Sequence, residues 1–401
     1  MPTIAQAEQA PARASLLYDP KLRAIVYQVV LTVVVVFLVY TAATNAVANL
    51  RAARIASGFG FLSTTSGFDV NQTFIPYTAA TSTYGDAFLV GLLNTLVVAA
   101  IGIFFATILG FVVGIARLSK NWVVAKVAMV YVEVIRNLPL LLQLLFWYVA
   151  VLTSLPGPRQ SLNAGDLFFL NQRGLFVPKP MLEGHAWLIP LTFIAGIVAT
   201  IAFHIWARRQ QEQTGRQYPV GLTALGLILG LPALVWAMLA LVGDRPVSFD
   251  VPRLQGFNFR GGMQLFPEFV ALLLGLVTYT AGFIAEVVRA GILAVSKGQT
   301  EAASALGLRP GHTLRLVVVP QAMRVIIPPL TSQYLNLTKN SSLAVAIGYP
   351  DLVQVFMGTV LNQTGQAVEV VAITMAVYLT ISLVTSAIMN VYNRRVAIVE
   401  R

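Results

Sequence analysis

Long apolar segments separated by short polar ones run through most of the chain. A helix needs about 20 mainly apolar residues to cross the hydrocarbon of a bilayer, and eight segments come close to or exceed that length. The seventh segment is the weakest because it contains Pro328 and Pro329. The predicted spans are residues 25–43, 87–116, 123–152, 187–206, 220–242, 266–294, 321–337 and 367–389.

The composition supports a membrane protein. Of the 401 residues, 57% are hydrophobic and only 11% are charged, with a mean hydropathy of +0.75. Soluble domains carry about 25% charged residues, so this chain has too little charge to cover a soluble particle. Intrinsic disorder, which needs low hydrophobicity, is excluded for the same reason. We therefore predict an all-α polytopic membrane protein with about eight transmembrane helices.

The basic residues predict the orientation of the spans. The chain has 27 Lys and Arg against 16 Asp and Glu, a net charge of +11. If the N-terminus lies in the cytoplasm, 17 basic residues fall in cytoplasmic segments and 8 in the longer loops on the other side. Lys and Arg accumulate on the cytoplasmic side of membrane proteins, so both termini are predicted to be cytoplasmic. This bias explains the positive charge without a nucleic-acid partner.

Catalytic and metal-binding patterns are missing from the sequence. It has no cysteine, and His185, His204 and His312 are scattered without the spacing of metal ligands. No G-x-x-x-x-G-K-[ST] loop for nucleotide phosphates occurs. No Ser-His-Asp or paired-carboxylate arrangement stands out in the apolar spans. A membrane enzyme is therefore disfavoured, and any ATP hydrolysis must come from another subunit.

The second predicted span carries small residues at every fourth position: Gly102, Ala106, Gly110 and Gly114. At helical period they share one face, which allows another backbone to approach closely. The partner could be another helix of the same bundle or a second subunit.

The segment after the sixth span, residues 298–307, predicts a short surface helix. Thr300 is a candidate N-cap, and Glu301 suits the positive N-terminal end of a helix. Gly307 can adopt the left-handed conformation that ends a helix. Such an alanine-rich helix could enter a groove on a partner, or it could simply connect two spans at the bilayer surface.

The same segment carries a family resemblance. The run Glu301-Ala302-Ala303, with Gly307 and Pro320 downstream, resembles the EAA loop of ABC-importer membrane subunits, although Val317-Val318-Val319-Pro320 stands where Ile-x-Leu-Pro is usual. Flanking motifs are similar to the polar amino-acid (histidine/glutamine-type) permease family. The chain is longer than the short members of that family, and in this it is most similar to the general L-amino acid subclass, Q-type subunit. These motifs lie at residues 91–96, 131–144, 279–292, 320–330 and 339–344.

The resemblance covers about residues 87–152 and 264–396 and implies a type I ABC importer permease fold. It implies three parts. Residues 1–86 comprise a cytoplasmic segment, a first transmembrane helix and a periplasmic loop. Residues 87–396 form the transmembrane domain, in which 153–263 is an insertion with an extra helical hairpin. Residues 298–320 form the cytoplasmic coupling loop, where Glu301, Ala302, Ala303 and Gly307 would contact the ATPase.

The function implied is that of a permease subunit of an ATP-driven importer, which forms the path for L-amino acids delivered by a periplasmic binding protein. The implied partners are a second homologous permease, two cytoplasmic ATPase subunits and the binding protein, in a bacterial inner membrane. ATP and Mg²⁺ would be used by the ATPase, with no cofactor in this chain. The alternative is an ion-coupled secondary transporter, which would more naturally show inverted repeats.

Charged residues within the spans are candidates for the translocation path, because charges in a membrane are costly and usually functional. Glu133 and Arg136 are three residues apart on the third span, as are Glu286 and Arg289 on the sixth. Each pair could neutralise itself on one helix face, or could meet the two ends of an amino-acid zwitterion. Lys339 could attract a carboxylate at the outer mouth or extend to the headgroups.

Overall fold

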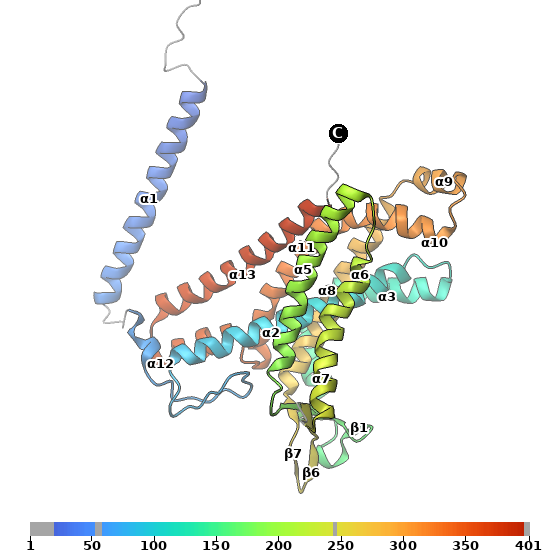
Figure 1. Cartoon of the computed structure of the whole chain (residues 1–401). Coiled ribbons are helices and arrows are strands. Elements are labelled where there is room, and N and C mark those ends of the chain that lie inside the picture. Colours follow the sequence, from blue (N-terminus) through green and yellow to red (C-terminus); the bar gives the residue numbers. More distant parts are fainter. Residues whose placement is uncertain (1–19, 53–57, 244–246, 397–401) are drawn as a thin grey trace, which may run out of the picture.

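The computed structural model describes residues 20–52, 58–243 and 247–396, and these are mainly helical (Figure 1). The predicted N-terminal segment before residue 20 lies outside the described residues, as do Arg13, Arg54, Arg245 and Arg401 from the charge count. The longer helices are α1 (Pro20–Ala52), α2 (Tyr84–Ala116), α3 (Trp122–Asn137), α5 (Leu188–Thr214), α7 (Leu231–Leu241), α8 (Pro267–Leu293), α11 (Val319–Asn340) and α13 (Ala367–Val396).

Shorter helical elements connect these helices. The α-helical ones are α4 (Leu140–Leu145), α6 (Val220–Leu225), α9 (Lys297–Ala305), α10 (Pro310–Thr313) and α12 (Leu361–Thr364). The 3-10 segments are η2 (Phe59–Ser63), η4 (Pro158–Gln160) and η7 (Ser341–Ile347). The π segments are η3 (Phe146–Leu152), η5 (Gly226–Gly230), η6 (Leu314–Val318) and η8 (Val353–Val360).

Seven helical stretches of the described chain are long and apolar enough to cross a membrane, or eight if one bent pair is counted as a span. The bent pair corrects the third predicted span, residues 123–152, because α3 and the stretch from α4 through η3 meet at 108°. Pro139 explains the bend: it holds Leu138 in an extended conformation and cannot continue the hydrogen bonding of α3. Pro328 and Pro329, by contrast, lie within a continuous α11.

The core of the molecule lies between α2, α8 and α11, with α3, α4 and η3 packed on α8. The small-residue face of α2 makes this possible. A Cβ added to Gly110 would lie 2.5 Å from Ile284 Cγ2, and one added to Gly114 would lie 2.9 Å from Val288 Cβ, both on α8. Gly102 faces Leu337 of α11 in the same way. The stripe is therefore used for packing within the chain.

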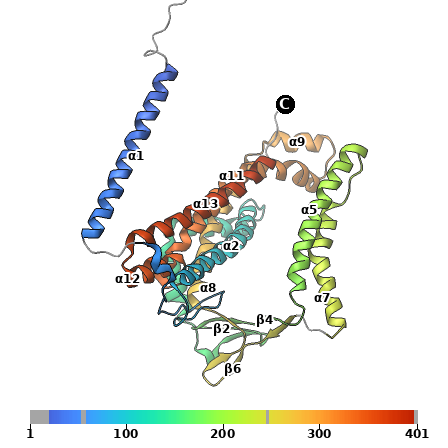
Figure 2. The same ribbon diagram turned by 60° about the vertical axis from the view of Figure 1, so that its left-hand side comes forward.

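Helices α5 and α7 form a hairpin that stands beside this core, and α1 lies apart from both (Figures 1 and 2). The hairpin is closely packed at Gly196, where an added Cβ would meet the Leu227 backbone. Both sides of the hairpin, like α1, expose long rows of apolar side chains. This exposure is expected of helices whose surroundings are lipid.

Short strands lie at one end of the hairpin, beside the start of α8, and the sequence analysis did not predict them (Figure 2). They come from both halves of the 153–263 insertion, so that β3 pairs with the distant β8. One sheet has the order β1-β2-β3-β8, and two two-stranded sheets pair β4 with β5 and β6 with β7, all antiparallel. The strands are β1 (Leu162–Ala164), β2 (Phe168–Asn171), β3 (Gly174–Val177), β4 (Lys179–Leu182), β5 (Val247–Asp250), β6 (Arg253–Gln255), β7 (Asn258–Arg260) and β8 (Met263–Leu265).

Candidate functional site

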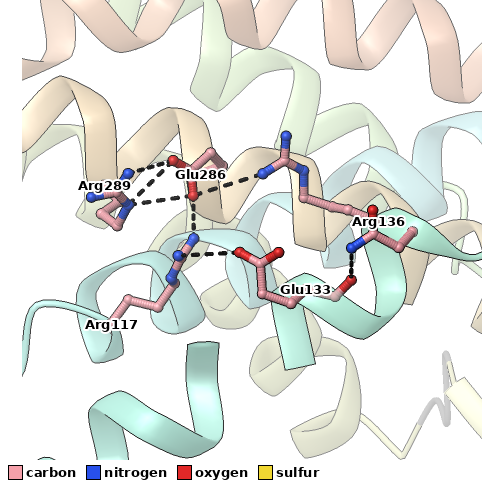
Figure 3. Close-up of polar contacts among 6 residues, drawn as sticks. Arg117, Glu133, Arg136, Glu286 and Arg289 are labelled. Carbon is pink, nitrogen blue, oxygen red and sulfur yellow. Dashed lines mark hydrogen bonds and ion pairs between the residues drawn. The ribbon is translucent and has the colours of Figure 1, made fainter. Parts of the chain in front are cut away.

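Five charged side chains from three helices meet at one end of the core (Figure 3). Glu286 of α8 is their centre. It accepts hydrogen bonds from Arg289, with 2.6 Å between Arg289 Nη2 and Glu286 Oε1, and from Arg117 just past the end of α2. Arg136 Nη1 of α3 lies 3.9 Å from Glu286 Oε2, and Arg117 Nη2 lies 3.9 Å from Glu133 Oε1. We call these residues the charge cluster.

The charge cluster confirms one predicted pair and corrects the other. Glu286 and Arg289 do pair on one face of α8. Glu133 and Arg136, however, do not neutralise each other: Glu133 faces Arg117, and Arg136 faces Glu286. The reason is that α3 packs against α8 and α2, so that charged partners on those elements lie closer than the residue three positions away.

Arg117 is not among the charged residues predicted for the path, yet it belongs to the charge cluster. A signal was present, since Arg117 follows Gly110 and Gly114 at i+7 and i+3 on the close-packed face of α2. Its side chain is only 10% exposed, against 25% for Glu286. Burying an unpaired guanidinium to this extent would cost free energy, so Arg117 can occupy this position only with its ion pairs.

A polar cavity of about 310 Å³ lies next to the charge cluster, between α8 and α11. Gln333, Asn336 and Asn340 line it from α11, and Tyr279, Thr280 and Phe283 from α8. We call it the amide cavity. Its size is at the lower end of the range of about 300–1,000 Å³ for ligand pockets.

The amide cavity and the charge cluster are continuous along α8. Tyr279, Phe283 and Glu286 follow one another at i, i+4 and i+7, so they share one face of the helix. The Arg136 guanidinium lies over the Phe283 ring, 5.2 Å from its centroid, while it also faces Glu286. Arg136 therefore connects the wall of the cavity to the charges.

The amide cavity is not among the features predicted from the sequence. The polar residues of α11 at positions 333, 336 and 340 have i, i+3 and i+7 spacing, which already places them on one helical face. The prolines and the hydropathy that characterise the predicted seventh span do not reveal this polar face.

Lys339 is separated from the other predicted path residues. It lines a different cavity of about 390 Å³, which α13 and η8 complete with Tyr378, Met357 and neighbouring side chains. The structure therefore brings Glu133, Arg136, Glu286 and Arg289 together but not Lys339.

The predicted surface helix exists as α9, which projects from the core (Figure 1). It begins at Lys297 after Ser296, so Thr300 is inside the helix and not its N-cap. Its end is as predicted: Gly307 has φ +76°, its N–H bonds to Ser304 O, and Leu308 N–H bonds to Ala303 O. These two bonds form a Schellman motif.

One residue of the predicted coupling set faces inwards. Ala303 is 4% exposed, whereas Glu301, Ala302 and Gly307 are exposed, as is the neighbouring Leu306 at 81%. The face of α9 that is open to a partner therefore consists of Glu301, Ala302 and the residues around Leu306. Ala303 instead holds α9 against its own chain.

No group of three or more His, Cys, Asp or Glu side chains with the geometry of a metal site occurs in the part of the chain that the structure describes. The charge cluster holds only two carboxylates, and both face guanidinium groups. Its chemistry is that of binding and positioning charged groups.

Comparison with known proteins identifies the family. The model of the family described as "Binding-protein-dependent transport system inner membrane component" matches residues 219–398. The chain is also 52% identical over 387 residues to the General L-amino acid transport system permease protein AapQ of Rhizobium johnstonii, a match that covers 96% of this chain and 95% of AapQ. The chain belongs to the amino-acid ABC transporter permease family.

Two further relatives match this permease over nearly all of its length. It is 52% identical to the Putative amino-acid ABC transporter permease protein YhdX of Escherichia coli, covering 96% of each chain. It is 42% identical to the Glutamate/glutamine/aspartate/asparagine transport system permease protein BztB of Rhodobacter capsulatus, again covering 96% of each.

Membership of this family confirms the predicted all-α permease fold and the role as a membrane-spanning transport subunit. The permease is not an enzyme, and ATP hydrolysis belongs to a separate partner subunit. The alternative of an ion-coupled secondary transporter receives no support from these relatives.

Proposed function

We propose that the permease carries L-amino acids inwards across a bacterial inner membrane, with both termini in the cytoplasm. The names of its relatives support amino acids as the substrate class, and the excess of Lys and Arg on one side supports the orientation. A periplasmic binding protein delivers the substrate, and two ATPase subunits supply the energy. ATP and Mg²⁺ are bound by those subunits, with no cofactor in the permease.

The amide cavity is the observation that carries the proposal for the translocation path. Amide side chains both donate and accept hydrogen bonds, so the cavity can bind the ammonium and carboxylate ends of an amino acid. At the charge cluster, Arg136 and Arg289 attract the carboxylate while Glu286 and Glu133 attract the ammonium. Lys339, towards the C-terminal end of α11, draws carboxylates to the outer mouth.

The exposure of the amide cavity supports a second permease subunit. Asn336 is exposed, and the described residues that line the cavity all come from α8 and α11. A polar side chain that faces hydrocarbon without partners costs free energy. A second, similar permease chain against this face would enclose the path between the two subunits.

We further propose that α9 is the contact with the ATPase. Glu301, Ala302 and Leu306 are exposed on an element that extends beyond the bundle. The small Ala302 side chain lets the helix approach a groove closely, and Gly307 fixes where the helix ends. The division into residues 1–86, a transmembrane domain at 87–396 with the 153–263 insertion, and a coupling loop at 298–320 belongs to the same proposal.

The test is uptake of labelled L-amino acids by the complete complex in proteoliposomes. Asn336→Leu removes one amide from the cavity at nearly constant volume. We expect the initial uptake rate to fall roughly fivefold, the effect of losing one net hydrogen bond, with complex assembly unchanged. Thr331→Val is the control: it lies on the opposite face of α11, and its hydroxyl bonds only to Ile327 O of its own helix. Full uptake by a Gln333→Leu/Asn336→Leu double variant would refute the path.

A further inference from the structure

A second cavity, of about 420 Å³, lies where α2 ends, α3 begins and α8 approaches its last turn. Arg117, Lys126 and Arg289 contribute its positive charge, and Trp122 and Met129 are among its apolar walls. It shares no lining residue with the amide cavity. We call it the basic cavity.

The basic cavity has more positive charge than its surroundings neutralise. In the charge cluster, Arg117, Arg136 and Arg289 face only Glu133 and Glu286, which leaves one positive charge over. Lys126 adds a second, since it makes no ion pair with any carboxylate that the structure describes. An anion in the cavity would therefore face two uncompensated positive charges.

The position of the basic cavity is that of a lipid headgroup. Arg117 directly follows Ala116, the last residue of a candidate membrane span, so the cavity lies at the end of the hydrocarbon region. Trp122 is 74% exposed at its rim. Tryptophan is enriched at the boundary between membrane and water, where its ring sits at the depth of the headgroups.

Helix α3 offers a surface for the acyl chains of the same lipid. Val123, Val127, Val130 and Val134 are 58%, 65%, 49% and 50% exposed. Their i, i+4, i+7 and i+11 spacing makes a continuous apolar stripe along the helix. The stripe begins beside Trp122, at the rim of the basic cavity. One lipid could therefore place its phosphate in the cavity and an acyl chain along the valines.

We propose that the basic cavity binds the phosphate of an anionic phospholipid. Arg117 lines the inner side and Lys126 lies near the rim, so the phosphate is held between a guanidinium group and an ammonium. Guanidinium and ammonium groups are the usual partners of phosphate oxygens. Basic pockets at this depth between transmembrane helices bind anionic headgroups. A zwitterionic lipid would bring its own cation into the cavity and bind less well.

The experiment uses the intact permease complex, exchanged into nanodiscs of phosphatidylcholine with a small fraction of phosphatidylglycerol and analysed by native mass spectrometry. The variant is Lys126→Gln, an exposed position that can change without disturbing the core. The matched control is Lys120→Gln, an exposed lysine in the turn just before α3 and outside the cavity lining. Only Lys126→Gln should lower the retained phosphatidylglycerol, by about fivefold, the contribution of one lysine at an anionic surface.

Three results would overturn the proposal. The wild-type permease could retain no more phosphatidylglycerol than phosphatidylcholine. The two lysine variants could lose the lipid equally, which would mean a diffuse charge effect. Excess inorganic phosphate could displace the lipid, in which case the site binds phosphate as such. Amino-acid uptake in pure phosphatidylcholine is measured in parallel, because failure of the lipid site leaves uptake intact whereas failure of the proposed function abolishes it.

Discussion

The close packing of α2 on α8 predicts that Gly110→Ala destabilises the permease. An added Cβ would lie 2.5 Å from Ile284 Cγ2, 2.6 Å from Ile284 Cβ and 3.2 Å from Ala281 O. Carbon atoms in contact prefer about 3.5–4.0 Å. Because the Cβ of Ile284 is one of the overlapping atoms, a change of rotamer cannot relieve the contact, and the helices must move apart.

The magnitude follows from two opposing effects. Overpacking a close-packed site typically lowers the free energy of unfolding by about 1–3 kcal/mol. Alanine in place of glycine stabilises a helix by about 1 kcal/mol. Because Ile284 is fully buried and its Cβ is one of the overlapping atoms, we expect an overpacking cost at the upper end, about 3 kcal/mol, and hence a net loss of about 2 kcal/mol. The assay is thermal unfolding of the detergent-purified permease, followed by tryptophan fluorescence.

The control is Gly226→Ala in the hairpin. Gly226 has helical angles, φ −63° and ψ −42°, and an added Cβ meets nothing within 4 Å. This variant should unfold at the wild-type temperature or slightly above it. If Gly110→Ala proved as stable as Gly226→Ala, the reasoning that α2 and α8 meet at the glycine stripe would be refuted.

Three further predictions concern the charge cluster, α9 and the topology. Glu286→Gln should lower both uptake and stability. Adding Arg289→Gln should restore only part of the loss, because the other guanidinium groups that faced Glu286 remain unpaired. Full restoration by the double variant would mean that Glu286 and Arg289 form a single independent ion pair. Ala302→Leu should lower the amount of ATPase that co-purifies with the permease without changing the unfolding temperature of the permease alone, and unchanged co-purification would make α9 a plain connector. In this cysteine-free chain, an impermeant thiol reagent should label Ser161→Cys from outside but Gln211→Cys only after permeabilisation, and outside labelling at both would contradict the orientation.

Much of the fold follows from local sequence features. Apolar length predicted the helices that cross the membrane, and the four-residue spacing at Gly102, Ala106, Gly110 and Gly114 predicted a close-packed face on α2. Gly307 was predicted correctly as the end of α9, because a left-handed residue there is a local requirement of the backbone. These features depend on residues that are near one another in the sequence.

Other features depend on long-range contacts that the sequence does not reveal. Glu133 and Arg136 pair with residues of other elements because α3 packs against α8 and α2, which helical spacing alone does not reveal. Ala303 is buried because η6 and α10 fold back beneath α9. Two strand pairings of the insertion are also long-range, since β3 pairs with β8 almost ninety residues away and β4 pairs with β5 across the helical hairpin. Sequence spacing predicts which residues share a helix face, and the tertiary fold decides what that face meets.

The source of energy for uptake tests the central claim most directly. The permease, its ATPase and its binding protein are reconstituted in proteoliposomes without any ion gradient, and uptake of a labelled L-amino acid is measured with and without ATP on the ATPase side. We predict uptake that requires both ATP and the loaded binding protein. Uptake by the permease alone, driven by a sodium or proton gradient in the absence of ATP, would contradict the account.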